Sequence, residues 1–205
     1  MTERFADLDR IADWGEFDLP ANSVERLEAF ERWLGDEAVE AGGIGPKESE
    51  RLWERHILDS AIFAGFVVGG DEVLDVGSGV GLPGLVVAVL RPDAELTLLD
   101  RSGRRCDLSR RAIRVLGLTN VRVVQGDLNG YIGEHSVAIS RASLPPSQLL
   151  EPLRGVSGLR EIVAAGSRST RPPPTDGWET VEIPGKVLGR PLWLMRASLS
   201  SNSAG

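Results

Sequence analysis

The sequence predicts an α/β fold in which a doubly wound sheet of seven strands follows a helical N-terminal extension. From residue 72 onward, short apolar runs alternate with segments of helical periodicity. Such alternation is typical of a parallel sheet that is covered by helices on both faces. Before residue 72 the apolar residues recur only at helical spacing. The 205 residues fit one domain of this kind and leave no room for a second large one.

The extension is expected to span residues 1–70 and to contain two or three helices. In the first, residues 24–34, apolar side chains recur every three or four positions, as expected for an amphipathic helix. After a glycine-rich break at residues 42–45, residues 48–66 show the same period. The expected core contacts of the second helix are Leu52, Ile57, Phe63 and Phe66.

The sheet is expected within residues 71–197, followed by a polar tail at 198–205 that should be disordered. Ser, Arg and Pro dominate residues 167–177, which predicts a flexible loop there. Strands are expected at 72–76, 95–100, 121–125, 137–140, 161–165, 180–183 and 192–196, and helices at 83–90, 103–116 and 148–153.

A glycine-rich turn follows the first strand and indicates a nucleoside cofactor. Gly79, Gly81 and Gly84 satisfy the dinucleotide spacing Gly-x-Gly-x-x-Gly, and Asp100 ends the next apolar run. However, Asp75 would put a carboxylate beside the two negative charges of a pyrophosphate. S-adenosyl-L-methionine carries a cationic sulfonium and a cationic ammonium instead, so the same carboxylate attracts it. The turn therefore favours S-adenosyl-L-methionine, with Asp75, Gly79 and Gly81 at its site.

The loops after the other strands supply further candidates, because ligands of a doubly wound sheet bind at the carboxyl ends of the strands. Asp100 can accept both ribose hydroxyls, although it could equally cap the following helix. Asp127 and Asn129 suit the adenine amino edge, with an ordinary polar turn as the alternative. Arg141 follows an apolar strand that directs it towards the cleft, and a plain surface charge is its alternative.

The residues near Arg141 also restrict the kind of acceptor. Adenine and amide N-methyltransferases commonly place Asn or Asp, two prolines and an aromatic residue after the fourth strand. This chain has Ser-Arg-Ala at 140–142, and Pro145 and Pro146 come without the amide and the aromatic residue. Cys106 lies on the helix after Asp100, where it is not placed as the nucleophile that cytosine C5 methylation requires. An acceptor that is already nucleophilic remains. Guanine N7 fits, because its lone pair attacks without prior loss of a proton, so positioning must supply the rate.

Composition restricts the partners, metal content and cellular compartment that we expect. A net charge of −7 argues against tight, unspecific binding to nucleic acid over the whole surface. The single cysteine excludes an internal disulfide and a cysteine-based zinc cluster, and no metal is expected. The longest apolar run is too short to span a membrane, and the first residues lack a signal core, so a cytoplasmic protein is expected. A basic series could contact phosphates or be a solvated helix face: Arg101, Arg104, Arg105, Arg110, Arg111 and Arg114.

Four strings together resemble the RsmG family, also called glucose-inhibited division protein B, which methylates N7 of a guanine in the decoding region of bacterial 16S rRNA. They are Arg-His-Ile-Leu-Asp-Ser at 55–60, the turn at 75–84 with its Leu-Pro-Gly ending, Leu-Leu-Asp at 98–100 and Ser-Arg-Ala at 140–142. The resemblance implies a class I methyltransferase (Rossmann-like) fold, S-adenosyl-L-methionine as cofactor, and 16S rRNA or the small ribosomal subunit as partner.

The resemblance also implies roles for individual residues. It places Gly77, Leu82, the Leu128 and Asn129 pair, and Arg141 at the cofactor. It places His56 and Asp59 in the site from the helical extension, so that these two and Arg141 are the catalytic candidates.

The chain departs from the family pattern in three places. These are residues 34–35, residues 126–130, and residues 164–166, where Ala-Ala-Gly stands in place of the expected Leu-Lys-Gly. Two basic groups expected on the substrate side are missing. Two alternatives therefore remain, a methyltransferase for a small molecule and a protein that binds the cofactor without transferring a methyl group. A monomer is expected.

Overall fold

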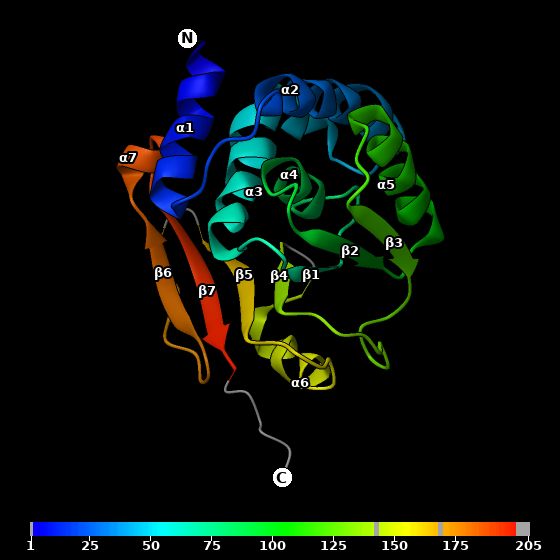
Figure 1. Ribbon diagram of the computed structural model, residues 1–205, viewed down its shortest axis with the longest axis vertical. Helices are drawn as coiled ribbons and strands as arrows, with labels where there is room; N and C mark the ends of the chain where they lie inside the picture. Colours follow the sequence, from blue (N-terminus) through cyan, green and yellow to red (C-terminus); the bar gives the residue numbers. More distant parts are fainter. Residues whose placement is uncertain (1, 142–143, 168–169, 200–205) are drawn as a thin grey trace.

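The computed structural model describes residues 2–141, 144–167 and 170–199, and it contains a mixed sheet of seven strands (Figure 1). The strand order is β3-β2-β1-β4-β5-β7-β6, so the chain returns past β1 when it enters β4. That reversal between β1 and β4 creates the position where doubly wound sheets bind ligands. The strands are β1 (Glu72–Val76), β2 (Glu95–Asp100), β3 (Val121–Gln125), β4 (Val137–Ser140), β5 (Glu161–Ser167), β6 (Glu179–Ile183) and β7 (Leu192–Ser198).

The sheet is parallel except for β7, which pairs antiparallel with both β5 and β6. The predicted seven-stranded, doubly wound sheet is confirmed, and the antiparallel direction of β7 is a feature that the alternation of strands and helices did not predict. Only residues 184–191 connect β6 to β7, and they hold the short helix α7 (Gly185–Leu188). A parallel crossover needs a dozen or more residues, whereas an antiparallel return needs very few.

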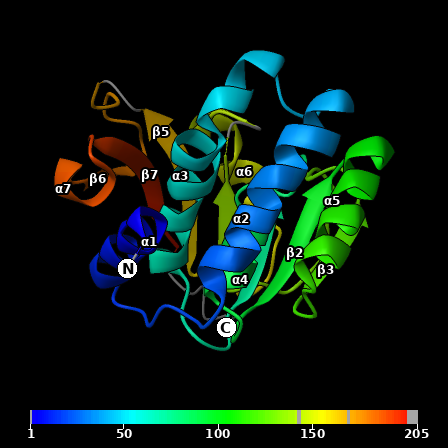
Figure 2. The same ribbon diagram turned by 90° about the horizontal axis from the view of Figure 1, so that it is seen from above.

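The two faces of the sheet pack into two separate cores. Val73, Leu96 and Val137 point into the larger core, which the helices α1 (Glu3–Gly15), α2 (Ser23–Trp33), α4 (Gly84–Leu90) and α5 (Gly103–Leu116) cover (Figures 1 and 2). Leu74 and Ala138, one residue further along their strands, point into the smaller core, to which Leu153 of α6 (Leu150–Leu153) contributes. Alternate residues of a strand face opposite sides, so these neighbours separate into different cores. Helices thus cover both faces, but very unequally.

The helical extension packs directly on the sheet. Phe30 of α2 and Phe63 are fully buried in the same core as the strand residue Val73. The predicted second helix is present as consecutive helical turns: Pro46–Arg51, Trp53–Leu58, α3 (Asp59–Ala61) and Ile62–Phe66. The described part of residues 1–70 therefore shares one core with the sheet, and the division at residue 70 stays a prediction.

The structure contains a helix that the sequence analysis missed, α1. Its buried residues Leu8, Ile11 and Ala12 have helical spacing, and Thr2 caps it by accepting a hydrogen bond from the amide of Phe5. The signal was present but lay among acidic residues. At the other end, β7 extends to Ser198, so the expected disordered tail began too early, and residues 200–205 lie outside the described part of the chain.

His135, just before β4, is expected to make folding stability depend on pH. Its side chain is 1% exposed, and Nε2 lies 2.8 Å from the hydroxyl of Tyr131. Burial, with a smaller contribution from the charge of Arg122, lowers the pKa of His135 to about 4. The unfolded chain therefore binds this proton more tightly, and the contribution of His135 to stability is complete above pH 6.5 and is lost as the pH falls towards 4.

The expected result for His135→Gln is a weaker loss of stability in acid than the wild type shows. Between pH 7 and pH 4 the wild type should lose roughly 1–3 kcal/mol more unfolding free energy than the variant. Urea denaturation at pH 7, 5.5 and 4 measures this difference. Identical pH dependence in both proteins would contradict it.

Candidate active site

The glycine-rich turn after β1 is held by the backbone of the neighbouring strand. Gly77 donates its amide to the carbonyl of Leu99 at 2.8 Å, and Gly79 donates to Oδ2 of Asp100 at 2.9 Å. Gly77, Gly79 and Gly81 have φ angles of 69°, 60° and 96°, which favour glycine strongly. A Cβ at Gly81 would lie 2.3 Å from Cδ1 of Leu85. These glycines therefore set the path of the turn and the position of Asp100.

Asp75 lies beneath this turn and is 0% exposed. Its Oδ2 accepts a hydrogen bond from the amide of Gly84 at 2.8 Å, where α4 begins, and its Oδ1 has no hydrogen-bond partner among the described residues. Burial raises the pKa of Asp75 to about 7, opposed by the hydrogen bond from Gly84 and by the charge of Arg141. The side chain of Asp75 thus stabilises the first turn of α4. The predicted direct contact with a cofactor stays a prediction, because this side chain does not line the cavity above it.

Asp75→Asn is expected to change how stability depends on pH. The folded wild type holds the Asp75 proton more tightly than the unfolded chain, so its stability falls as the pH rises from about 4 to 7. A neutral amide removes that dependence while its oxygen can still accept from Gly84. The stability of the variant relative to the wild type should therefore increase by roughly 1–3 kcal/mol between pH 4.5 and pH 8. Urea denaturation of both proteins at the two pH values measures this difference. If the difference in unfolding free energy between variant and wild type were the same at pH 4.5 and pH 8, the pKa of Asp75 would not be raised by folding.

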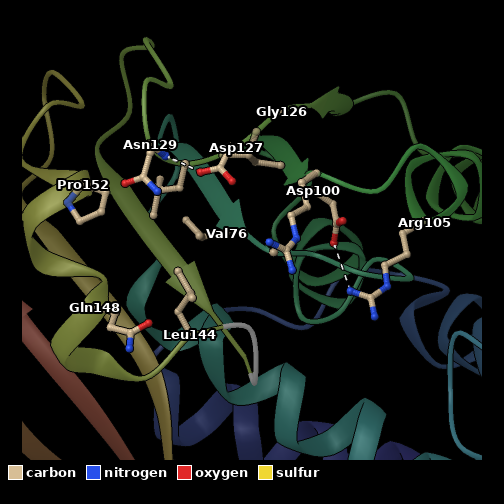
Figure 3. Close-up of a pocket in the computed structure, with 13 residues that line it drawn as sticks. Val76, Asp100, Arg105, Gly126, Asp127, Asn129, Leu144, Gln148 and Pro152 are labelled. Atoms are coloured by element: carbon tan, nitrogen blue, oxygen red, sulfur yellow. Dashed lines mark hydrogen bonds and ion pairs between the residues drawn. The ribbon is translucent and has the colours of Figure 1, made fainter.

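The first cavity, of about 550 Å³, lies at the carboxyl ends of β1, β2 and β3 (Figure 3). Five of the predicted cofactor residues line it: Gly77, Asp100, Asp127, Leu128 and Asn129. Gly79, Gly81 and Leu82 are not among its lining residues, although Gly79 binds Asp100. The sequence analysis missed Leu144, Gln148 and Pro152, which close the cavity from the segment around α6.

Asp100 occupies the central wall of the first cavity and is 4% exposed. Besides the bond from Gly79, it accepts the amide of Ser102 on Oδ1 at 2.8 Å. The cap of α5 is Ser102, whose hydroxyl accepts from the amide of Arg105, so the alternative role of Asp100 as the capping residue is not what the structure contains. Each carboxylate oxygen keeps a second lone pair, so Asp100 can still accept the two hydroxyls of a ribose.

The loop after β3 contributes the wall next to Asp100, since the amide of Gly126 donates to the carbonyl oxygen of Asp100 at 3.0 Å. Asp127 and Asn129 are exposed towards the first cavity, and Leu128 between them is buried at 7% exposure (Figure 3). Oδ1 of Asp127 accepts the amide of Asn129 at 2.8 Å, which is a local turn of the kind that Asp often forms. The polar-turn interpretation and the binding interpretation are therefore compatible, since the turn presents both side chains to the cavity.

The second cavity, of about 380 Å³, lies between the helical extension and the ends of β4, β5 and β7. All three catalytic candidates, Arg141, His56 and Asp59, line it. Nη2 of Arg141 lies 3.0 Å from Nδ1 of His56, and its Nη1 donates to the carbonyl oxygen of Arg55 at 2.9 Å. Arg141 thus joins the end of β4 to the extension. Ala142, the last residue of the Ser-Arg-Ala string, lies outside the described residues.

Two further residues contact the catalytic candidates His56 and Asp59, and sequence analysis identified neither. Oε2 of Glu48 lies 3.4 Å from Nε2 of His56. Nη2 of Arg190 donates to Oδ1 of Asp59 at 2.6 Å and to the carbonyl oxygen of Glu54. Asp59 therefore holds the segment before β7 against the extension. No local pattern marks Arg190, because its partner lies 131 residues away.

Known proteins resemble this chain in sequence across most of the sheet and the extension. A family model described as rRNA small subunit methyltransferase G matches residues 23–157. The chain belongs to this family. The corresponding protein of Arthrobacter sp. (strain FB24), named ribosomal RNA small subunit methyltransferase G, is 41% identical over 153 residues, which cover 71% of this chain and 70% of that protein.

Mycobacterial members of the methyltransferase G family match a shorter region. The protein of Mycobacterium leprae (strain TN) is 43% identical over 125 residues, or 57% of this chain and 51% of that protein. The chain thus spans about half the length of the mycobacterial relatives that it matches.

Solved structures place this methyltransferase G family member in the class I methyltransferase (Rossmann-like) fold, as predicted. MtNAS in complex with MTA and tNA aligns with a TM-score of 0.56 at 20% identity, covering 87% of this chain and 75% of that one. A SAM-dependent methyltransferase from Aquifex aeolicus aligns with a TM-score of 0.56 at 17% identity, covering 78% and 98%. At such identities the likeness concerns the fold alone.

Two features are absent from the part of the chain that the structure describes. Within residues 2–141, 144–167 and 170–199, no group of three His, Cys, Asp or Glu side chains could hold a metal ion. Over the same ranges no helix has the length and apolar character needed to cross a membrane.

Proposed function

We propose that this protein transfers the methyl group of S-adenosyl-L-methionine to N7 of a guanine in the decoding region of 16S rRNA. The observation that carries the proposal is the position of two cavities at the carboxyl edge of one sheet. The first contains the ribose acceptor Asp100, and the second contains Arg141 and His56 from the family strings. A cofactor site beside an acceptor site at this edge is what methyl transfer between two bound molecules requires.

The first cavity fits the cofactor in size and chemistry. Its volume lies in the range of cavities that hold ligands of this size. Asp100 can accept the ribose hydroxyls, Asp127 and Asn129 can pair with the adenine amino edge, and the apolar Leu99 and Leu128 can cover the flat base. Among proteins of similar fold, a mutant of MtNAS was solved in complex with S-adenosylmethionine.

The second cavity fits an acceptor that needs no general base. When bound, the cofactor supplies an electrophilic methyl group on a cationic sulfonium. The lone pair of guanine N7 is available at neutral pH, so the protein has only to align it and exclude water. Arg141, fixed by His56 and by the carbonyl of Arg55, has five N–H donors and can direct one towards guanine O6. Phe63, Leu192 and Leu194 give the cavity an apolar wall for the base.

The test is methyl transfer from labelled cofactor to small ribosomal subunits from a strain that lacks this modification, followed by mapping of the labelled base. Free 16S rRNA in a parallel reaction distinguishes naked RNA from the assembled subunit as substrate. We expect label on N7 of a single guanine in the decoding region. Label only in small metabolites, or cofactor binding without transfer to either RNA, would contradict the proposal and favour one of the two alternatives.

A further inference from the structure

Helix α5 lies at the outer side of the molecule, beside the edge strand β3 (Figures 1 and 2), and its sequence is rich in arginine. Its buried side, which includes Cys106, Ser109 and Ala112, packs on the sheet. All the arginines of this segment are exposed, and together they form the α5 arginine surface: Arg101, Arg104, Arg105, Arg110, Arg111 and Arg114.

The α5 arginine surface is only partly neutralised by acidic residues. Arg110 pairs with Asp107 at 2.9 Å, Arg111 lies 3.8 Å from Glu37, and Arg105 lies 4.0 Å from Asp100. Arg101, Arg104 and Arg114 have no carboxylate within ion-pair distance among the described residues.

Elsewhere among the described residues most arginines have a carboxylate within ion-pair distance, although some exposed ones, such as Arg26 and Arg32 of α2, do not. The net charge is −7, so carboxylates are in excess. Where arginines contact buried carboxylates, they have structural roles: Arg160 binds Asp71 with both amino groups, and Arg190 binds Asp59. The α5 arginine surface contains three exposed arginines without a carboxylate partner in the described part of the chain. They give this part of an acidic protein a local positive charge, and none of the three contributes to packing.

The α5 arginine surface is also continuous with the first cavity. Arg101 and Arg105 line that cavity, and Figure 3 shows Arg105 beside Asp100 at its edge. From there α5 extends for 14 residues, roughly 21 Å, with Arg104 near its beginning and Arg114 near its end. A polyanion whose base enters the second cavity and whose backbone passes the mouth of the first cavity would therefore meet these guanidinium groups, which continue along α5.

We propose that the α5 arginine surface binds the phosphate backbone of the RNA strand whose base enters the site. The guanidinium group suits this role because its planar donors match phosphate oxygens. The surface supplies a local contact on an otherwise acidic protein, in place of the two basic groups that are missing from the family pattern. The proposal rests on the proposed function for the identity of the RNA, but not for the chemistry of the contact.

The test compares a double variant, Arg104→Gln with Arg114→Gln, with the wild type. Neither residue lines the first or the second cavity, so cofactor affinity and the thermal midpoint of unfolding should be unchanged. The affinity for a fluorescent single-stranded RNA fragment of the decoding region should fall about ten-fold at low salt. The slope of log affinity against log salt should become less steep by about 1.4, since each lost phosphate contact removes about 0.7.

Two controls separate charge from local structure. Arg10→Gln makes the same change on α1, where Arg10 pairs with Asp7 and which packs beside α7 rather than α5. It should leave the salt slope unchanged. Arg104→Lys with Arg114→Lys keeps both charges and should restore most of the slope.

The outcomes for the surface and for the enzyme are distinct. A double variant with the wild-type salt slope would overturn the proposal for α5, even if the wild type methylates small subunits normally. A wild type that methylates nothing but binds the RNA fragment through these arginines would contradict the proposed function and leave the surface proposal supported. A wild type that binds neither the fragment nor small subunits would overturn both.

Discussion

Asp100→Ala is expected to lower the affinity for S-adenosyl-L-methionine by about 100-fold or more. The carboxylate is buried at the wall of the first cavity, where it can accept two ribose hydroxyls. Two hydrogen bonds to a charged acceptor contribute about 1.5 kcal/mol each, and about 2.7 kcal/mol corresponds to about 100-fold in affinity. The change also releases the amides of Gly79 and Ser102, so the turn that shapes the cavity should loosen as well. Isothermal titration calorimetry with the cofactor measures the loss.

Asp127→Ala is the matched control for this prediction. Asp127 lines the same cavity but is exposed, and its carboxylate accepts the nearby amide of Asn129. Its removal should lower cofactor affinity by less than about 10-fold, because an exposed hydrogen bond competes with water. Unchanged binding by Asp100→Ala would refute the ribose role. Equal losses in the two variants would show that Asp100 has no special position.

The parts of the fold that local periodicity controls could be predicted from the sequence. Most strands begin and end where apolar runs do, and α5 occupies the predicted residues 103–116. The direction of β7 was not predicted, because it depends on how few residues connect it to β6 rather than on its own pattern. The helix α1 was predictable, since Leu8, Ile11 and Ala12 have the right spacing. Acidic residues stand between these apolar positions, so the helical spacing was overlooked.

In the candidate site, too, some features could be predicted from the sequence and others depend on tertiary packing. Loops after strands could be identified because strand ends in a parallel sheet meet at one edge. Of the residues chosen in this way, Asp100 and Asp127 line the first cavity and Arg141 lines the second, while their roles stay predictions. The sequence could not show that the carboxylate of Asp75 is covered by Gly84, since burial depends on packing of the whole turn. Nor could it pair Arg190 with Asp59, because long-range ion pairs leave no local pattern.

Arg141→Ala is expected to lower turnover by roughly 100-fold, with a much smaller effect on folding stability. Arg141 is half-buried and joins the end of β4 to the extension through Nδ1 of His56 and the carbonyl of Arg55. Without it, the acceptor loses a donor and the two walls of the second cavity lose their connection. A misplacement of about 1 Å at an active site can cost about 100-fold in rate, or about 2.7 kcal/mol of barrier. Single-turnover methylation of small subunits at saturating cofactor measures the chemical step.

Arg160→Ala provides the opposite result for comparison. Arg160 also joins distant segments, since both its amino groups donate to Asp71 at 3.0 Å. It precedes β5, however, and therefore lies at the amino end of the strands, away from both cavities. Its loss should lower the unfolding free energy by about 1–3 kcal/mol and leave the rate of methyl transfer unchanged. Arg141→Lys should be intermediate, because an ammonium keeps the charge that acts on Asp75 but lacks the planar fork with which Arg141 contacts His56 and the carbonyl of Arg55. If Arg141→Ala turned over at the wild-type rate, Arg141 would be a bridge between the extension and the sheet without a role in aligning the acceptor.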